Sequence, residues 1–437
     1  MKILYVADNR NRGNYGCRAT STALSMLVGE RHEIVGRITG RYTHYDTGNL
    51  VFCKYFPSWL YKWLGSCRSW NRFRPTVHRI LHFLTRKRYL FGPCDFACQD
   101  MERMIKNFKK CLPANNQLKE FDIESYDFDA MVVNGEGSFI FCTPPWRESL
   151  VISMCMYWAL ELGKKVFFMN AMFSDMPNSP KNQKTLDVVN ELFSRCEVVV
   201  ARESISFEYV KSNLPSVNPI LKPDALFTWY RFINDEHHIE NGKYYLAHSA
   251  EKDESYFNQD FTKPYILVSG SSSPVIEKNR KQAVDAYSNL VNSIKRSYSG
   301  KVYLIQVCEG DDFLNDVASL TKTPIIALET PLLAAAKMLA NAQVFVSGRY
   351  HPAIMASQGG TPCVFMGSNS HKTYSLQNLL CYPDVKEYNV IPDDNDIKEM
   401  TAKTLQYVKT QREVRKRIKE RAYELYLESR TMLDLIK

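Results

Sequence analysis

Short apolar runs alternate with longer amphipathic segments along the first half of the chain. KILYVAD (2–8), DAMVVNG (129–135) and EVVVA (197–201) have the length and composition of buried strands. Between such runs, RATSTALSMLVGER (18–31) and KTLDVVNELFSRC (184–196) place apolar residues at helical spacing. Alternating strands and helices predict βαβ units around a parallel sheet.

The pattern stops in a polar, irregular stretch over 234–263 and then restarts. The second half carries a long helical pattern over 276–297 and apolar runs typical of strands, among them PYILVSG (264–270), KVYLIQV (301–307), QVFVSG (343–348) and PCVFM (362–366). The same alternation therefore occurs twice, which predicts a second parallel sheet.

We therefore expect an α/β protein with two doubly wound, Rossmann-like domains facing a cleft. The N-terminal domain would cover 1–250 and the C-terminal domain 262–400, followed by an amphipathic helical tail over 401–437. A length of 437 residues agrees with two domains, each large enough to bury its own core.

Composition restricts the class of protein further. The 12 cysteines form no CxxC pair and several lie in apolar runs, which is typical of reduced thiols in a cytoplasm and argues against a zinc site. The N-terminus shows no signal-peptide pattern, and the longest apolar stretch, SLVISMCMYWALEL (149–162), is too short to span a bilayer. We expect a cytoplasmic protein.

A basic segment carries much of the formal charge of +9, which predicts an acidic partner. No Asp or Glu occurs over 53–94, where lysines and arginines are interleaved with Trp and Phe. This composition is typical of a peripheral patch on an anionic membrane. The alternative is a solvated basic insertion whose aromatic residues pack on its own domain. No nucleic-acid-binding motif accompanies the segment, so we expect no nucleic-acid partner.

Two glycine-containing segments follow predicted strands, where open α/β sheets bind ligands. NGEGS (134–138) places Gly135, Glu136, Gly137 and Ser138 at the end of one strand, so that backbone N–H groups can approach a ligand closely. GNYG (13–16), which contains Asn14, follows the first strand in the same way. Each segment alone is more typical of an ordinary turn than of a ligand site.

Cationic side chains also occur at predicted strand ends. Arg202 directly follows EVVVA, and its planar guanidinium suits a carboxylate or a phosphate. Arg349 and His351 follow VFVSG, and Lys372 lies one βα unit later. Because the carboxyl ends of parallel strands meet at one edge, these cations favour an anion site, with His351 suited to proton transfer near neutral pH.

Two acidic residues near these cations are open to more than one interpretation. Glu203 follows Arg202 and is better explained as a first-turn residue favoured by the helix dipole than as a catalytic acid. Asp224, in KPDALF, is either a helix cap or a site residue.

Taken together, these segments resemble the polysaccharide pyruvyl transferase family. The matches are the Asn-x-Gly turn at Asn14, NGEGSF, the RESIS segment at Arg202, KPDALF, and SGRYHPAIMASQGGTPCVF followed by Lys372. The resemblance covers nearly the whole chain in order. It implies a GT-B-like fold and transfer of the enolpyruvyl carbon of phosphoenolpyruvate to two sugar hydroxyls, which leaves a cyclic ketal and phosphate.

The resemblance also implies roles for individual residues. Arg202, Arg349 and Lys372 would hold the carboxylate and phosphate of phosphoenolpyruvate, and His351 would be the general acid and base. The binding set would be completed by Asn14, Gly135, Glu136, Gly137, Ser138 and Asp224. The N-terminal domain would be the acceptor side, and the C-terminal domain would contain most of the donor site. Neither a metal nor a resident cofactor is implied, and phosphoenolpyruvate is a co-substrate.

The implied partner is a cell-surface polysaccharide, such as a capsule or exopolysaccharide, or its polyprenyl-linked oligosaccharide precursor. Two other functions remain open. One is a GT-B glycosyltransferase that uses a sugar nucleotide, whose diphosphate would also favour Arg349, Lys372 and helix N-termini. The other is a catalytically silent relative that binds glycan.

Overall fold

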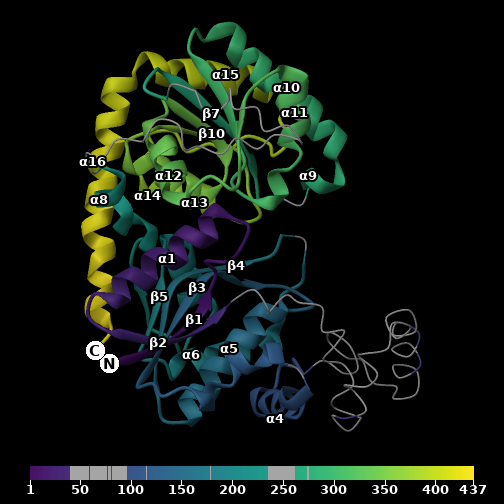
Figure 1. Cartoon of the computed structure of the whole chain (residues 1–437), viewed down its shortest axis with the longest axis vertical. Coiled ribbons are helices and arrows are strands. Elements are labelled where there is room, and N and C mark those ends of the chain that lie inside the picture. The colour runs from purple at the N-terminus through teal and green to yellow at the C-terminus, as the bar shows by residue number, and fades with distance from the viewer. Residues whose placement is uncertain are drawn as a thin grey trace. The chain divides into compact units, whose positions relative to one another are not determined.

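The computed structural model describes residues 1–39, 59, 76, 80, 96–114, 116–177, 179–234, 261–272 and 275–437 (Figure 1). Its described residues divide into two compact units. Unit 1 comprises Met1–Asn11, Val28–Arg202 and Ser206–Leu221, and unit 2 comprises Arg12–Leu27, Glu203–Ile205 and Lys222–Lys437.

Unit 1 is built on a six-stranded sheet within the described residues, in the order β2-β1-β3-β4-β5-β6, and every pair in it is parallel. Its strands are β1 (Lys2–Asp8), β2 (Glu33–Thr39), β3 (Ala130–Phe141), β4 (Lys165–Asp175), β5 (Val198–Ala201) and β6 (Pro219–Leu221). Its helices include α4 (Met101–Cys111), α5 (Arg147–Glu161), α6 (Gln183–Ser194) and most of α7 (Ser204–Asn213).

Unit 2 has a five-stranded parallel sheet in the described residues, in the order β11-β10-β7-β8-β9. Its strands are β7 (Tyr265–Ser271), β8 (Lys301–Ile305), β9 (Ile325–Ile326), β10 (Val344–Gly348) and β11 (Cys363–Phe365). Its helices include most of α1 (Tyr15–Gly29), then α8 (Tyr230–Ile233), α9 (Val275–Lys278), α10 (Arg280–Ser297), α11 (Leu314–Thr321), α12 (Leu332–Asn341), α13 (Tyr350–Gln358), α14 (Lys372–Leu379), α15 (Asp394–Lys409) and α16 (Gln411–Arg430).

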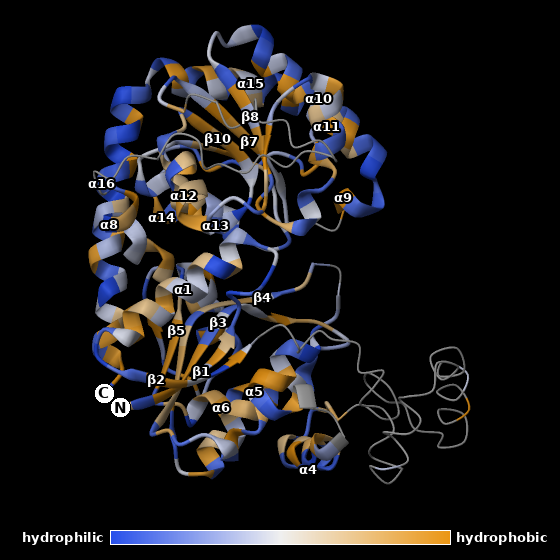
Figure 2. Ribbon diagram, viewed as in Figure 1, coloured by the Kyte–Doolittle hydropathy of each residue, from blue (hydrophilic) through white to orange (hydrophobic). Residues whose placement is uncertain are grey.

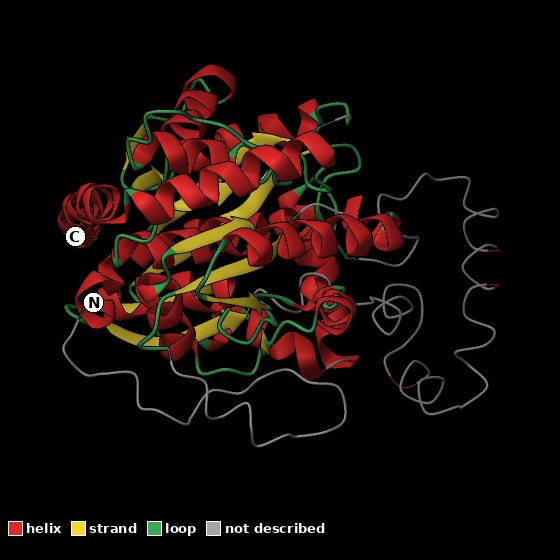
Figure 3. Cartoon of the chain, turned by 90° about the horizontal axis from the view of Figure 1, so that it is seen from above, coloured by secondary structure: helices red, strands yellow, loops and turns green. Residues whose placement is uncertain are grey.

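Burial explains why the strands read as continuous apolar runs. The central strands of each sheet are hydrophobic over most of their length (Figure 2). Figure 3 shows that helices lie on both sides of the strands. In β10 every residue is buried, and in β3 nearly every residue is. Strands that helices cover on both faces have no solvent-facing side, so they show no polar alternation.

Each sheet reverses its strand order once. In unit 1 the reversal lies between β1 and β3, and in unit 2 it lies between β7 and β10. In open α/β sheets such a switch point leaves a crevice outside the carboxyl ends of the two strands, and ligands bind there. The two switch points are therefore the positions to search for function.

The structure corrects one local prediction. We expected NGEGS to lie at the end of a strand, but β3 continues through it to Phe141, paired with β4 along its length. The glycines do not end the strand because a register shift between Glu136 and Phe139 accommodates one extra residue.

The units also differ from the continuous ranges that we expected. Most of α1 belongs to unit 2 although the chain around it belongs to unit 1, and unit 2 begins its longest segment at Lys222, before the predicted boundary. The helical tail is part of unit 2, where Thr401 of α15 donates a hydrogen bond to Ser293 of α10 (3.0 Å). The basic segment over 53–94 lies outside the described residues, apart from isolated positions. Among the helices that the structure describes, none is both long and apolar enough to cross a membrane.

Candidate active site

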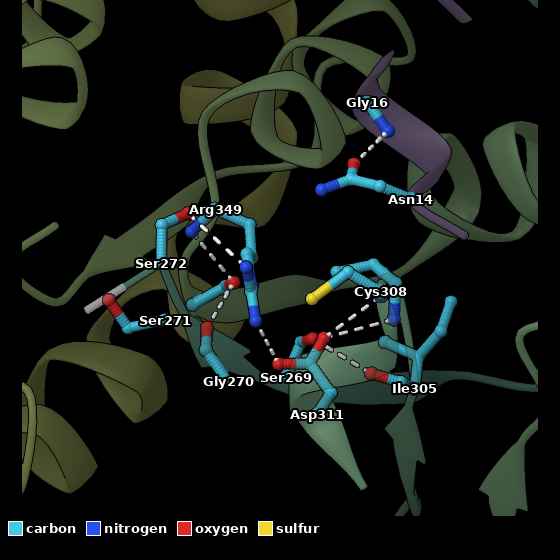
Figure 4. Close-up of polar contacts among 12 residues, drawn as sticks. Asn14, Gly16, Ser269, Gly270, Ser271, Ser272, Ile305, Cys308, Asp311 and Arg349 are labelled. Carbon is cyan, nitrogen blue, oxygen red and sulfur yellow. Dashed lines mark hydrogen bonds and ion pairs between the residues drawn. The ribbon is translucent and has the colours of Figure 1, made fainter. Parts of the chain in front are cut away.

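Arg349 lies at the switch point of unit 2. It directly follows β10 and occupies the N-cap position of α13. Its Nη1 donates a hydrogen bond to Ser272 (3.3 Å), which follows the neighbouring strand β7, and its Nη2 pairs with Asp311 (Figure 4). The arginine is 7% exposed and Asp311 is fully buried.

Asp311 fixes the guanidinium in place. Its Oδ2 accepts hydrogen bonds from the backbone N–H groups of Val307 (3.1 Å) and Cys308 (3.2 Å) at the carboxyl end of β8. A Cβ on Gly270 would lie 2.3 Å from Asp311 Oδ1, so only glycine fits beside the carboxylate. Burial alone would lower the pKa of Arg349, but Asp311 outweighs burial and raises it above its usual value. Arg349 therefore stays charged.

Part of the Arg349 guanidinium remains available. Its Nε is buried and has no hydrogen-bond partner among the described residues. A buried N–H group without a partner is costly, and an anion placed against it would satisfy it. The neighbouring Cys308 is not a nucleophile at neutral pH, because burial raises its pKa to about 12.

His351, two residues after Arg349, is held by a buried carboxylate. Its Nε2 lies 3.3 Å from Oδ2 of Asp224, and Asp224 is fully buried. The other oxygen, Oδ1, accepts hydrogen bonds from Thr20 Oγ1 (2.8 Å) and from the backbone N–H of Leu226 (2.9 Å). An imidazole paired with a fixed carboxylate keeps one tautomer and one orientation, as a general acid and base requires.

Asp224 is a helix cap, which is one of the two interpretations that the sequence left open. The backbone contact to Leu226 makes it the N-cap of a short 3-10 helix, Ala225–Trp229, and the opposite oxygen faces His351.

The opposite edge of His351 packs against the start of α1. A Cβ on Gly16 would lie 2.5 Å from Nδ1 of the imidazole, so the helix approaches this closely only because residue 16 is glycine. Asn14 holds the helix start, since its Oδ1 accepts hydrogen bonds from the N–H groups of Gly16 (2.8 Å) and Cys17 (3.2 Å) (Figure 4). The side-chain oxygen of Asn14 therefore caps the helix.

Lys372 begins α14, after β11, and its Nζ donates a hydrogen bond to Asn369 (2.7 Å). The residue before it, His371, has its Nε2 3.0 Å from Oε1 of Glu203. Glu203 is buried, and its Oε2 accepts hydrogen bonds from Ser375 (2.5 Å) and from the N–H of Ile205 (2.8 Å). Unit 2 therefore contains a second histidine–carboxylate pair.

The remaining predicted residues lie in unit 1. Arg202 follows β5 and is 2% exposed. Within β3, the Glu136 carboxylate accepts a hydrogen bond from Asn9 (2.5 Å), and Ser138 donates one to Glu148 of α5 (2.9 Å). A Cβ on Gly135 would lie 2.5 Å from Ala171 of β4, whereas at Gly137 the nearest atom would be 3.9 Å away.

A family model described as polysaccharide pyruvyl transferase matches residues 14–370. The chain belongs to the polysaccharide pyruvyl transferase family. The match supports a transferase of polysaccharide biosynthesis. It confirms the predicted family. Among curated proteins, none matches the chain significantly.

Solved structures that resemble this pyruvyl transferase family member share its fold at low sequence identity. UDP-GlcNAc 2-epimerase from Neisseria meningitidis, bound to UDP-GlcNAc, is 12% identical with a TM-score of 0.53, over 100% of this chain and 99% of the epimerase. A putative UDP-N-acetylglucosamine 2-epimerase from Listeria monocytogenes is 10% identical with a TM-score of 0.52, over 100% and 95% of the two chains. The predicted fold class, with two Rossmann-like domains as in GT-B proteins, is confirmed.

Sequence analysis of this family member missed two residues of unit 2. Asp311 follows the predicted strand KVYLIQV in CEGDD, so its position after a strand was a usable signal. His371 precedes Lys372, but its partner Glu203 is 168 positions away, and no local pattern connects them. In the described part of the chain, no group of three or more His, Cys, Asp or Glu side chains could hold a metal ion.

Proposed function

We propose that this family member transfers the enolpyruvyl carbon of phosphoenolpyruvate to two hydroxyls of a sugar in a cell-surface polysaccharide or its lipid-linked precursor. The observation that carries the proposal is the pairing of two functions at one strand end. Arg349, with an unpartnered buried Nε, and His351, oriented by Asp224, are separated by a single residue after β10. An anion clamp and a proton carrier side by side suit a reaction that protonates an anionic donor.

The methylene carbon of phosphoenolpyruvate gains a proton and becomes a methyl group, and the oxygen of one sugar hydroxyl bonds to the adjacent carbon. The bond from that carbon to the phosphate oxygen breaks, phosphate leaves, and the second hydroxyl oxygen closes the ketal. Of the two hydroxyl protons, one replaces the proton given to the methylene carbon and the other leaves with phosphate.

The residues of unit 2 have separate roles in this scheme. Arg349 binds the donor through the part of its guanidinium that Asp311 leaves available, and Lys372 adds a second cation after the neighbouring strand β11. His351 delivers the proton to the methylene carbon and, as the neutral imidazole, takes one from the attacking hydroxyl. Asp224 stabilises the imidazole in its protonated state, before the first transfer and after the second.

A sugar-nucleotide glycosyltransferase is the second candidate. The epimerase of similar fold is bound to UDP-GlcNAc, and a nucleotide diphosphate would also bind at arginines and helix N-termini. The arrangement around His351 favours phosphoenolpyruvate, since donor protonation requires a proton carrier beside the anion clamp.

Ligand-dependent melting separates the two candidates. Phosphoenolpyruvate should raise the melting temperature of the purified protein more than UDP-GlcNAc does, because a ligand stabilises the state that binds it. Incubation with phosphoenolpyruvate and a lipid-linked glycan extract should release phosphate and increase the glycan mass by one pyruvate ketal. Greater stabilisation by UDP-GlcNAc, without phosphate release, would favour the glycosyltransferase. Glycan binding without turnover would favour a silent relative.

The acceptor and the place of action are part of the same proposal. Precursors of envelope polysaccharides are carried on polyprenyl lipids at the inner face of the cytoplasmic membrane, so the proposed enzyme works in the cytoplasm at that surface. The basic, aromatic composition of 53–94 supports this position.

A further inference from the structure

A cluster of four buried polar side chains lies at the switch point of unit 1. Asn9 follows β1, Asn134 and Glu136 belong to β3, and Asn170 belongs to β4, so three adjacent strands supply it. Asn9 Nδ2 donates a hydrogen bond to Glu136 Oε2 (2.5 Å), and Asn170 Nδ2 donates one to Asn134 Oδ1 (3.2 Å). None of the four is more than 7% exposed.

The backbone is irregular at this level of all three strands. Ala7 (φ 61°), Glu136 (φ 37°) and Asn170 (φ 60°) adopt the left-handed conformation, which residues other than glycine rarely adopt. Each lies at or beside a register shift that adds a residue to its strand. Bulges redirect side chains. Strained backbone persists only where the surrounding structure holds it, and such residues cluster at ligand sites.

The polar groups of the cluster are incompletely satisfied. Asn134 Nδ2 is buried and has no hydrogen-bond partner in the described part of the chain. No described Lys, Arg or His nitrogen lies within 4.0 Å of the Glu136 carboxylate. A buried amide donor and a buried carboxylate without a counter-ion are both costly, and a suitable ligand would relieve both costs.

The chemistry of these groups selects the ligand. Glu136 requires a hydrogen-bond donor and Asn134 offers one, and a hydroxyl group is able to donate to the first and accept from the second. A phosphate or carboxylate would be repelled by the unpaired Glu136 carboxylate. The cluster is therefore suited to a neutral, polyhydroxylated ligand and unsuited to an anionic donor.

We propose that Asn9, Asn134, Glu136 and Asn170 form the subsite for the acceptor sugar, with Glu136 and Asn134 binding its hydroxyls. The assignment to an acceptor rests on the proposed function, but binding of neutral sugar to unit 1 does not. Asn9 and Asn170 are positioning residues, because they hold the carboxylate and the amide oxygen that face them.

Two variants test the subsite against a matched control. Glu136→Gln removes the charge and keeps the shape, and Asn170→Gly removes the amide at a φ that glycine adopts without strain. Glu120→Gln is the control, since Glu120 is a partly buried carboxylate of unit 1 that accepts hydrogen bonds from Thr39. Saturation-transfer NMR would measure binding of the methyl glycosides of glucose, galactose, mannose, N-acetylglucosamine and N-acetylmannosamine. The shift of melting temperature with phosphoenolpyruvate would be measured in the same proteins.

At least one methyl glycoside should bind the wild-type protein and Glu120→Gln equally. Both cluster variants should bind it about tenfold more weakly or worse, because each loses a hydrogen bond that involves a buried polar group. Their response to phosphoenolpyruvate should be unchanged. If Glu136→Gln does not fold, Asn170→Gly carries the test.

Two results would overturn the subsite: wild-type affinity for the glycoside in both variants, or no binding of any of these glycosides to the wild-type protein. If the glycoside results hold and phosphoenolpyruvate stabilises no variant or wild-type protein, the subsite stands and the proposed donor is wrong.

Discussion

His351 receives its orientation from two sides, a carboxylate at Nε2 and a helix start at Nδ1. If His351 moves the proton and Arg349 binds the donor, as proposed, variants of the two residues should differ in their effects. His351→Asn should lower phosphate release from phosphoenolpyruvate about 10²- to 10⁴-fold while the melting-temperature shift with phosphoenolpyruvate is retained. Arg349→Lys should instead reduce the melting-temperature shift with phosphoenolpyruvate, because it weakens donor binding. A point charge cannot replace a guanidinium that contacts both Asp311 and Ser272. Normal turnover in His351→Asn would make that histidine structural.

Gly16 provides a steric test of the same site. Gly16→Ala should destabilise the protein by about 1–3 kcal/mol, since its Cβ would overlap the imidazole of His351 and force it to move. Turnover should also fall, because the imidazole would lose its position. Gly29→Ala is the matched control at the other end of α1, where a Cβ meets nothing within 4 Å. Urea unfolding should show that variant unchanged or more stable by up to about 1 kcal/mol. Equal effects at both glycines would contradict the close approach.

Asp8 links stability to pH in unit 1. Burial alone would raise its pKa, but hydrogen bonds from Arg10 outweigh burial and hold the pKa below its usual 3.8. A depressed pKa contributes stability above the unfolded-state value, and this contribution is lost as pH falls through the folded-state value. Asp8→Asn should therefore cost about 1–2 kcal/mol at neutral pH and almost nothing well below pH 3.8.

Urea unfolding of Asp8→Asn at several pH values measures this difference directly. Asp127→Asn is the control, because its partner Lys2 and the carboxylate itself are both solvent-exposed. A cost that persists unchanged into acid would show that Asp8 acts through packing rather than through its charge.

At the level of single residues, the sequence indicated some residues of the candidate site and missed others for a physical reason. Arg349 and His351 were predictable because both follow one apolar strand and their positions relative to it are fixed locally. The position of Asp311 after a predicted strand was a usable signal, but its pairing with Arg349 was not predictable, since that contact spans 38 positions and depends on how β8 is placed in the sheet. Contacts between strand ends are set by strand order, which a hydrophobic pattern does not encode.

Among the elements, the strands were easier to predict than their ends. The apolar run before NGEGS correctly indicated a strand, but glycine, glutamate and serine are poor strand formers, so the pattern predicted that the strand ends there. Pairing with β4 overrides that local preference along β3. The bulges that result redirect Glu136, so the failed prediction falls on a candidate functional segment.

Docking of α16 onto unit 2 gives a test at the scale of an element. Arg415 donates hydrogen bonds to the carbonyl oxygens of Ala342 (2.8 Å) and Ala340 at the end of α12. Arg415→Ala should lower the free energy of unfolding by about 1–3 kcal/mol, because it removes these bonds and the packing of the arginine stem. Arg412→Ala, at an exposed position of the same helix, should change it by less than about 0.5 kcal/mol. Similar melting curves for both variants would show that α16 is not held through Arg415.

For the whole molecule, the repeated pattern predicted two parallel sheets, and the structure contains them. The unit to which α1 belongs could not be predicted from the sequence. The helix follows β1 directly, yet most of it packs in unit 2, where the N–H of Tyr15 donates a hydrogen bond to the carbonyl of Val307 (2.8 Å). Local periodicity identifies a helix and its apolar face, but it does not identify the sheet that the face covers.

The basic segment over 53–94 supports a prediction about where the protein works. Each Lys or Arg near an anionic membrane contributes on the order of 1 kcal/mol, so a few engaged residues give association that weakens with salt. Changing Arg86, Lys87 and Arg88 to glutamate should release the protein from vesicles of mixed phosphatidylcholine and phosphatidylserine. Activity on a short soluble acceptor should be unaffected, because that acceptor requires no membrane.

The matched control reverses the same number of charges elsewhere. Arg412, Lys416 and Arg417 are exposed on α16, and changing them to glutamate alters the net charge equally. If the α16 variant still sediments with the vesicles and the variant at 86–88 does not, the attraction belongs to the basic segment rather than to the net charge of +9. If both variants bind as the wild-type protein does, the basic residues are solvated and the aromatic residues between them pack on their own domain.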